Sequence, residues 1–211
     1  MLLTKPRQTD AAAQTTRSQF AAEGMKAVTK LLKDPLRKFR VLDFGSHHQA
    51  NLEYFAQIPG RYYIANIWPS VQDKHREGLT VEDYRNKPID DSDLLEGYEE
   101  SFDLILAWDI LNYLNKNSLQ GLLRRVCEYS HKGTLFHFLI ATQKFMPAEP
   151  AKITLEHEHF NYQAGSSRLI QSARYSPTAL EKYLEGFSIF KLNLLDNGLQ
   201  EHVFWFDNNK E

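Results

Sequence analysis

Residues 39 to 45 read Phe-Arg-Val-Leu-Asp-Phe-Gly, and the prediction of the fold starts from this stretch. An apolar strand runs into an acidic residue, Asp43, and Gly45 follows two positions later. A ligand site begins in this way in doubly wound α/β domains, because the strand emerges at the carboxyl edge of the sheet and the glycine lets the backbone turn sharply into a helix. The stretch therefore predicts an α/β domain whose ligand site lies at the carboxyl edge of a parallel sheet.

The composition is that of an ordinary globular protein. A chain of 211 residues with 42% hydrophobic residues has the size of one domain with a sizeable core. Its formal net charge of −2 gives no indication of a nucleic-acid partner. A single cysteine, Cys127, excludes an internal disulfide framework and is typical of a reducing compartment. Since neither a signal peptide nor a run of roughly 20 apolar residues is present, we expect a cytoplasmic protein without a membrane partner.

Strand-like and helix-like segments alternate along most of the chain. The hydrophobic patterns predict helices over residues 10–33, 49–57 and 118–130, and one that starts at Ser176-Pro177. They predict strands over 39–44, 61–66, 101–108, 134–142, 187–195 and 200–206, and a weak strand over 79–83. Asn197-Gly198 is a strong hairpin signal between the last two strands.

This order predicts an α/β fold with a doubly wound, mostly parallel, seven-stranded sheet. Right-handed crossovers would place helices on both faces, and the final hairpin would add one antiparallel edge strand. Residues 1–38 would form an N-terminal helical extension packed on the main domain, residues 39–211. Within that domain, residues 143–175 form an insertion at the carboxyl edge, which we expect to cover the substrate.

The order of elements and the first loop together resemble the class I S-adenosylmethionine-dependent methyltransferase family, which has a seven-stranded, Rossmann-like fold. The resemblance covers roughly residues 10 to 206. In that family the first strand is followed by an acidic residue, any residue and then Gly-x-Gly-x-Gly. Here His47 and Gln49 stand at the second and third glycine positions, so the glycine-rich loop is degenerate.

The resemblance implies S-adenosylmethionine as the cofactor, with S-adenosylhomocysteine as the product. It also implies a set of cofactor-binding residues at the ends of the strands, namely Asp43, Gly45, Ser46, Asn66, Asp91, Trp108 and Asp109. Asn66 stands where the family places an acidic residue for the ribose hydroxyls, and an amide can accept one hydrogen bond and donate another. The bland alternatives are a generic strand-to-helix turn at Asp43 and Gly45, and a solvated acidic loop at Asp90, Asp91 and Asp93.

Three residues are candidates for catalysis. Asp109 is a polar residue directly after an apolar strand, a position that packing alone does not explain. His157 and His159 alternate with glutamates and would point the same way on a strand, and an imidazole titrates near neutral pH. The alternatives for His157 and His159 are a metal-binding pair and, in preference to it, a solvated polar strand face. His47 and His48 do not converge on a metal without a third ligand, so no metal site is expected.

The sequence therefore indicates a methyltransferase that acts on an unidentified, small-molecule acceptor. Methyl transfer needs alignment more than covalent help, so the absence of an obvious catalytic set does not argue against an enzyme. The main alternative is a non-catalytic binding or scaffold protein on the same fold, supported by His47, Gln49 and Asn66. A third alternative, a nucleotide-sugar or NAD-type α/β protein, is disfavoured by the closing hairpin. The oligomeric state stays open.

Overall fold

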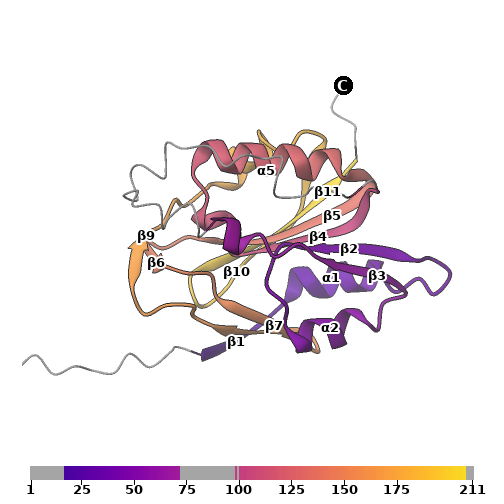
Figure 1. Ribbon diagram of the computed structural model, residues 1–211, viewed down its shortest axis with the longest axis horizontal. Helices are drawn as coiled ribbons and strands as arrows, with labels where there is room; N and C mark the ends of the chain where they lie inside the picture. Colours follow the sequence, from indigo (N-terminus) through magenta and orange to yellow (C-terminus); the bar gives the residue numbers. More distant parts are fainter. Residues whose placement is uncertain (1–16, 72–97, 99, 208–211) are drawn as a thin grey trace, which may run out of the picture.

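A six-stranded mixed sheet forms the centre of the computed structural model, which describes residues 17–71, 98 and 100–207 (Figure 1). The strand order is β10-β11-β5-β4-β2-β3. Pairing is parallel from β3 through β2 and β4 to β5, and β11 is antiparallel to both β5 and β10. The strands are β2 (Phe39–Asp43), β3 (Gly60–Ile64), β4 (Phe102–Trp108), β5 (Ser130–Ala141), β10 (Phe187–Leu194) and β11 (Leu199–Phe206).

Two details of the predicted sheet need correction. The described part of the sheet has six strands, and the weak strand expected over residues 79–83 lies outside the described residues. The reversed strand, β11, does not lie at the edge but between β5 and β10. The physical reason is burial: five of the eight residues of β11 are buried and none is exposed, whereas only Phe187 of β10 is buried, so β10 takes the edge position.

Helices cover both faces of the sheet, as predicted. On one face lie α5 (Lys116–Glu128) and the short α6 (Pro177–Glu181), and on the other lie α1 (Glu23–Leu31) and α2 (Gln49–Phe55) (Figure 1). The side chains of Asn115 and Ser176 cap α5 and α6 by accepting hydrogen bonds from backbone N–H groups three residues later. Among the described residues, no helix is both long enough and apolar enough to cross a bilayer.

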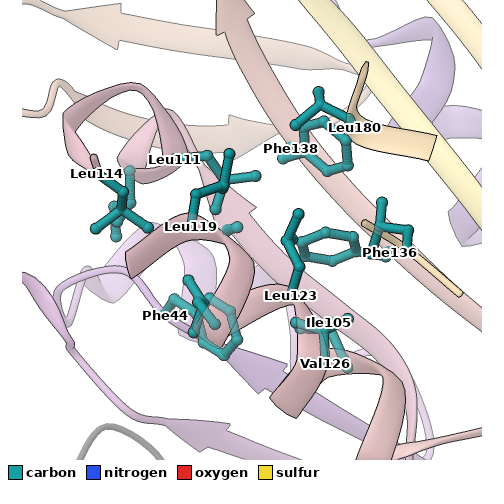
Figure 2. Packing of buried hydrophobic residues seen from close by; sticks show 14 of the residues in the cluster. Phe44, Ile105, Leu111, Leu114, Leu119, Leu123, Val126, Phe136, Phe138 and Leu180 are labelled. Atoms are coloured by element: carbon teal, nitrogen blue, oxygen red, sulfur yellow. The ribbon is translucent and has the colours of Figure 1, made fainter. Parts of the chain in front are cut away.

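The core on the α5 side shows why this region was predictable. Leu119, Leu123 and Val126 form one stripe of α5 and pack against Ile105 and Phe136 of the sheet (Figure 2). All seven residues of β4 are buried, as its apolar run after Asp103 predicts for a central parallel strand.

The N-terminal region differs from the predicted helix over residues 10–33. Arg17–Ala21 is a strand, β1, which pairs antiparallel with β8 of the insertion, and the helix begins only at Glu23. β1 alternates exposed with half-buried residues, the period of a strand on a surface. Residues 10–16 lie outside the described part.

Glu201 of β11 anchors the start of α1 on the sheet. Its two carboxylate oxygens accept the backbone N–H groups of Gly24 at 2.7 Å and Met25 at 2.9 Å. The same carboxylate lies 3.1 Å from Nε2 of His137 and accepts from Nδ2 of Asn193 at 2.8 Å. The side chain is fully buried, so a carboxylate far along the chain neutralises the N-terminus of this helix inside the core.

The insertion, residues 143–175, is built of four short strands. They are β6 (Phe145–Pro147), β7 (Lys152–Glu156), β8 (His159–Gln163) and β9 (Leu169–Gln171), arranged as the sheets β1-β8-β7 and β6-β9. Buried Asn51 of α2 docks β7 against the domain, since its amide donates to the carbonyl of Ile153 and accepts the N–H of Leu155.

Candidate functional site

A cavity of about 440 Å³ lies between the carboxyl ends of β2 and β4 and the insertion. The sheet edge contributes Gly45, Ser46, Trp108 and Asp109, and the insertion contributes residues 149–153 and 163–165. The volume is within the range of small-molecule sites. The predicted position of the site, at the carboxyl edge and under the insertion, thus coincides with a real cavity.

Asp43 organises the turn after β2 from within the protein. One oxygen, Oδ1, accepts the N–H of Gly45 and Nε1–H of Trp108, each at 2.6 Å, and the other accepts the hydroxyl of Tyr62. Burial raises the pKa of Asp43 to about 6, although all three hydrogen bonds act in the opposite direction. The side chain is fully buried and does not line the cavity, so Asp43 shapes the loop without reaching the space beside it.

Gly45 and Trp108 meet at the wall of the cavity. A Cβ atom on Gly45 would lie 2.6 Å from Cδ1 of the Trp108 indole, so only glycine permits this approach. Trp108 itself has a φ of 47°, a left-handed conformation that is unusual for a bulky residue. Its indole is 4% exposed and packs edge-on against His137 and Phe160. Backbone strain of this kind concentrates at ligand sites, which agrees with the position of Trp108.

Asp109 lines the cavity and has one unsatisfied carboxylate oxygen. Oδ2 accepts the N–H of Ala151 from the insertion at 2.9 Å, while Oδ1 accepts no hydrogen bond from any residue that the structure describes. Burial raises the pKa of Asp109 to about 7, and the Ala151 N–H opposes that shift. A carboxyl group with a pKa near neutrality can exchange a proton with a ligand at physiological pH.

The loop that replaces the glycine-rich sequence presents two polar side chains to the cavity. Ser46 and His48 both line it, and Oγ of Ser46 lies 3.0 Å from Nε2 of His48. Burial lowers the pKa of His48, helped by the charges of Lys152 and His47. Gln49 turns away, because it starts α2 and donates to Glu53.

Asn66 lies at the same edge but outside the cavity lining. The N–H of Ala65 donates to the carbonyl of Asp43 and that of Ile67 donates to the carbonyl of Phe44, so the chain around Asn66 runs beside the β2 turn. Asn66 is exposed and has a φ of 45°. Gly45 and Trp108 share one cavity as predicted, whereas Asn66 does not line it and Asp91 falls outside the described residues.

The structure does not bring the two histidine candidates to the cavity. His157 occupies the tight turn between β7 and β8 with a φ of 55°, and His159 is the first residue of β8. The expectation that both point the same way on one strand is therefore wrong, because Glu156 pairs with His159 across a hairpin. Both line a separate surface groove beside α1 and α2. The described residues contain no group of three metal-ligating side chains.

Sequence reasoning missed two tyrosines that support the site. Tyr62 donates to Asp43, and the hydroxyl of Tyr113 bonds to the carbonyls of Pro147 at 3.2 Å and Glu149 at 2.8 Å. Tyr113 thereby ties the insertion to the segment after β4. Tyr113 lies in the run Asp109 to Leu114 directly after a strand, and that position was a signal for the site. No sequence pattern indicates which groups its hydroxyl will contact.

Comparisons with solved structures identify the fold. A S-adenosylmethionine-dependent methyltransferase from Clostridium acetobutylicum superposes with a TM-score of 0.50 at 15% sequence identity, covering 88% of this chain and 89% of that chain. The N-methyltransferase NodS from Bradyrhizobium japonicum, in complex with S-adenosyl-L-homocysteine, gives a TM-score of 0.50 at 14% identity, covering 87% of this chain and 86% of that one.

No protein-family model matches the sequence, and no curated protein matches it. At identities this low the likeness concerns the fold, and on that level the resemblance seen in the sequence is confirmed. The chain has the α/β fold of the class I S-adenosylmethionine-dependent methyltransferases.

Proposed function

We propose that this protein is a S-adenosylmethionine-dependent methyltransferase that acts on a small-molecule acceptor. The observation that carries the proposal is the cavity lined by Gly45, Ser46 and Asp109, at the carboxyl edge of a sheet with the methyltransferase fold. Open α/β sheets bind their ligands at this edge.

The residues around the cavity fit the cofactor by their chemistry. Gly45 exposes backbone at the cavity wall, where a side chain would collide with Trp108. Ser46 adds a hydroxyl group, and the amide of Asn66 can serve a pair of ribose hydroxyls from the neighbouring strand end. When bound, S-adenosylmethionine supplies a methyl group on a positively charged sulfur.

The chain's own contribution is to position the reacting groups. The turn after β2 is held by Asp43, and the insertion is held over the edge by Asp109 and Tyr113. A cavity of about 440 Å³ favours a small acceptor, because its volume is that of a small-molecule site. Fixed geometry of this kind supplies most of the acceleration in a direct displacement.

The test is a calorimetric titration of the full chain with S-adenosylhomocysteine. We expect binding by the wild-type protein and none by Gly45→Val, because a β-branched side chain has no room beside Trp108. Asn66→Asp should tighten binding about tenfold, the lower end for a charge-assisted hydrogen bond, since the position is exposed.

Asn197→Asp is the matched control. It adds the same charge in the β10–β11 hairpin, where Asn197 accepts the N–H of Leu199 and an aspartate can do the same. Its affinity should equal that of the wild type. A wild-type protein that binds no ligand at millimolar concentration, and gains no binding from Asn66→Asp, would overturn the proposal. That result would leave the non-catalytic binding protein as the better explanation.

A further inference from the structure

Among the described residues that line the cavity, Asp109 has the only buried side-chain atom without a hydrogen-bond partner. The residue is 4% exposed, and its Oδ1 atom has no partner among the described residues. Burying a carboxylate oxygen without a donor is costly, so such an atom calls for a ligand group that donates. The other oxygen, Oδ2, already accepts the N–H of Ala151 and is sufficient to hold the insertion, so Oδ1 is not needed for that structural role.

Hydrogen bonds of the Asn112 side chain fix the backbone of Asp109. The amide of Asn112 donates to the carbonyl of Asp109 at 2.8 Å and to the carbonyl of Leu139 at 2.9 Å. Its oxygen accepts the N–H of Ala141 at 2.8 Å. Asn112 thus joins the end of β4 to the end of β5 and holds Asp109 in place at the cavity wall, which is the preorganisation that a proton acceptor needs.

The charged and titratable groups around Asp109 favour a cationic ligand. Tyr113 and Tyr162 lie near enough for the charge of Asp109 to raise the pKa of each phenol, although burial is the larger cause. Both phenols therefore stay neutral. Glu149 and Lys152 both line the cavity and both are exposed to solvent, so their opposite charges offset each other; burial disfavours a charged His48, and Asp109 is left as the buried acid at the cavity.

We propose, resting on the methyltransferase function above, that the methyl acceptor is an amine and that Asp109 accepts its proton. The ammonium form is attracted to the carboxylate and donates one proton to it. The nitrogen lone pair then forms the new N–CH3 bond while the S–CH3 bond breaks and its electron pair stays on sulfur. The proton on Asp109 passes to solvent when the product leaves.

Other acceptors suit this carboxyl group less well. An alcohol is a far weaker acid than an ammonium ion, so a carboxylate is a poor base for it. A carboxylic acid acceptor would be repelled by the buried carboxylate of Asp109. A thiol is only a weak hydrogen-bond donor and would satisfy Oδ1 of Asp109 poorly.

The experiment incubates the full chain with S-adenosylmethionine that carries a deuterated methyl group. The acceptors are a panel of amines, alcohols, thiols and carboxylic acids matched in carbon skeleton. A second assay replaces the panel with a soluble metabolite extract. Mass spectrometry locates the label in each product. The expected result is label on nitrogen. Label on oxygen, sulfur or carbon overturns the inference, and so does an absence of labelled amine in both the panel and the extract while S-adenosylhomocysteine still binds. Failure of that ligand to bind would instead overturn the methyltransferase function itself.

Variants then test the role of Asp109. For the amine that accepts the label, Asp109→Asn should lower kcat at least a hundredfold and abolish the acidic limb of the pH profile. Its affinity for S-adenosylhomocysteine should change less than threefold. Asp196→Asn, in the exposed hairpin turn, is the matched control and should behave as the wild type. An Asp109→Asn protein with wild-type kcat and pH profile would overturn the assignment.

Discussion

Glu201 and Asp109 are both buried carboxylates, yet the molecule surrounds them in opposite ways. Glu201 accepts hydrogen bonds from two backbone N–H groups at the start of α1 and from Asn193, and it contacts His137. Burial acts to raise its pKa, but these partners outweigh burial and lower it. Asp109 has a single described donor on one oxygen, and its pKa rises to about 7. The difference teaches that saturation marks a carboxylate used for structure, and incompleteness marks one left for a ligand.

The largest effect on the free energy of unfolding is expected at Glu201. Replacing Glu201 with Ala leaves two N–H groups of α1 and the side chains of His137 and Asn193 without their acceptor inside the core. We expect a loss of about 3–5 kcal/mol in the free energy of unfolding, as when one partner of a buried charged network is removed. Urea denaturation measures it.

The control for that measurement is Glu158→Gln. Glu158 forms an exposed ion pair with Lys26 at 2.7 Å, and solvent screening leaves such a pair little effect on the free energy of unfolding. Equal losses from the two variants would show that the buried network does not anchor α1.

Replacing Asp109 with Asn should change the pH dependence of the free energy of unfolding. The folded chain holds the Asp109 proton more tightly than the unfolded chain, in which the pKa is near 3.8. This contribution to stability is complete below the unfolded pKa and is lost as the pH rises through about 7. Between pH 5 and pH 8, wild type should therefore lose about 2–3 kcal/mol that Asp109→Asn does not lose.

Urea denaturation of both proteins at several pH values across that range isolates Asp109, because every other group titrates in both. Curves that run parallel would mean that the carboxyl group of Asp109 is not perturbed in the folded chain.

The smallest effect on the free energy of unfolding is expected at the start of α1, where Gly24 contacts Glu201. Gly24→Ala places a Cβ atom 2.6 Å from Cδ of Glu201, so the carboxylate must shift from its donors. We expect a cost of about 1–3 kcal/mol, typical of overpacking. In the Glu201→Ala background the same change should cost clearly less, and a double-mutant cycle measures that coupling. Additive losses would place the strain elsewhere.

Local patterns in the sequence were sufficient for the central sheet and for two of its helices. The apolar run before Trp108, the stripe of α5 and the Asn197-Gly198 hairpin each specify one element, because burial and turn geometry act within a few residues of the chain. Strand β1 was missed for the opposite reason. Its partner is residues 159–163, and a short segment that borrows its pairing from a distant strand has only a weak pattern of its own.

The site was predictable to a similar, limited extent. Asp43, Gly45, Trp108 and Asp109 follow strands whose carboxyl ends must meet, so their proximity follows from topology. The histidines were placed wrongly because an alternating run does not distinguish a strand from the two sides of a tight hairpin. The hydrogen bond of Asp109 to Ala151 depends on how the insertion folds back, which no local pattern encodes.

The attachment of α1 to Glu201 also has a consequence for the order in which the chain folds during synthesis. Gly24 and the residue that holds its N–H are 177 positions apart, and β1 waits for residues 159–163. A ribosome adds residues at about 5–20 per second, so the N-terminal segment emerges roughly ten seconds or more before its acceptor exists. Until then its apolar stripe of Met25 and Val28 lacks β10 and β11, which together with β5 are its partners on the sheet. The segment of β1 and α1 is thus made long before β11 and is among the last to reach its native position, so its apolar stripe is a binding site for a chaperone on the nascent chain.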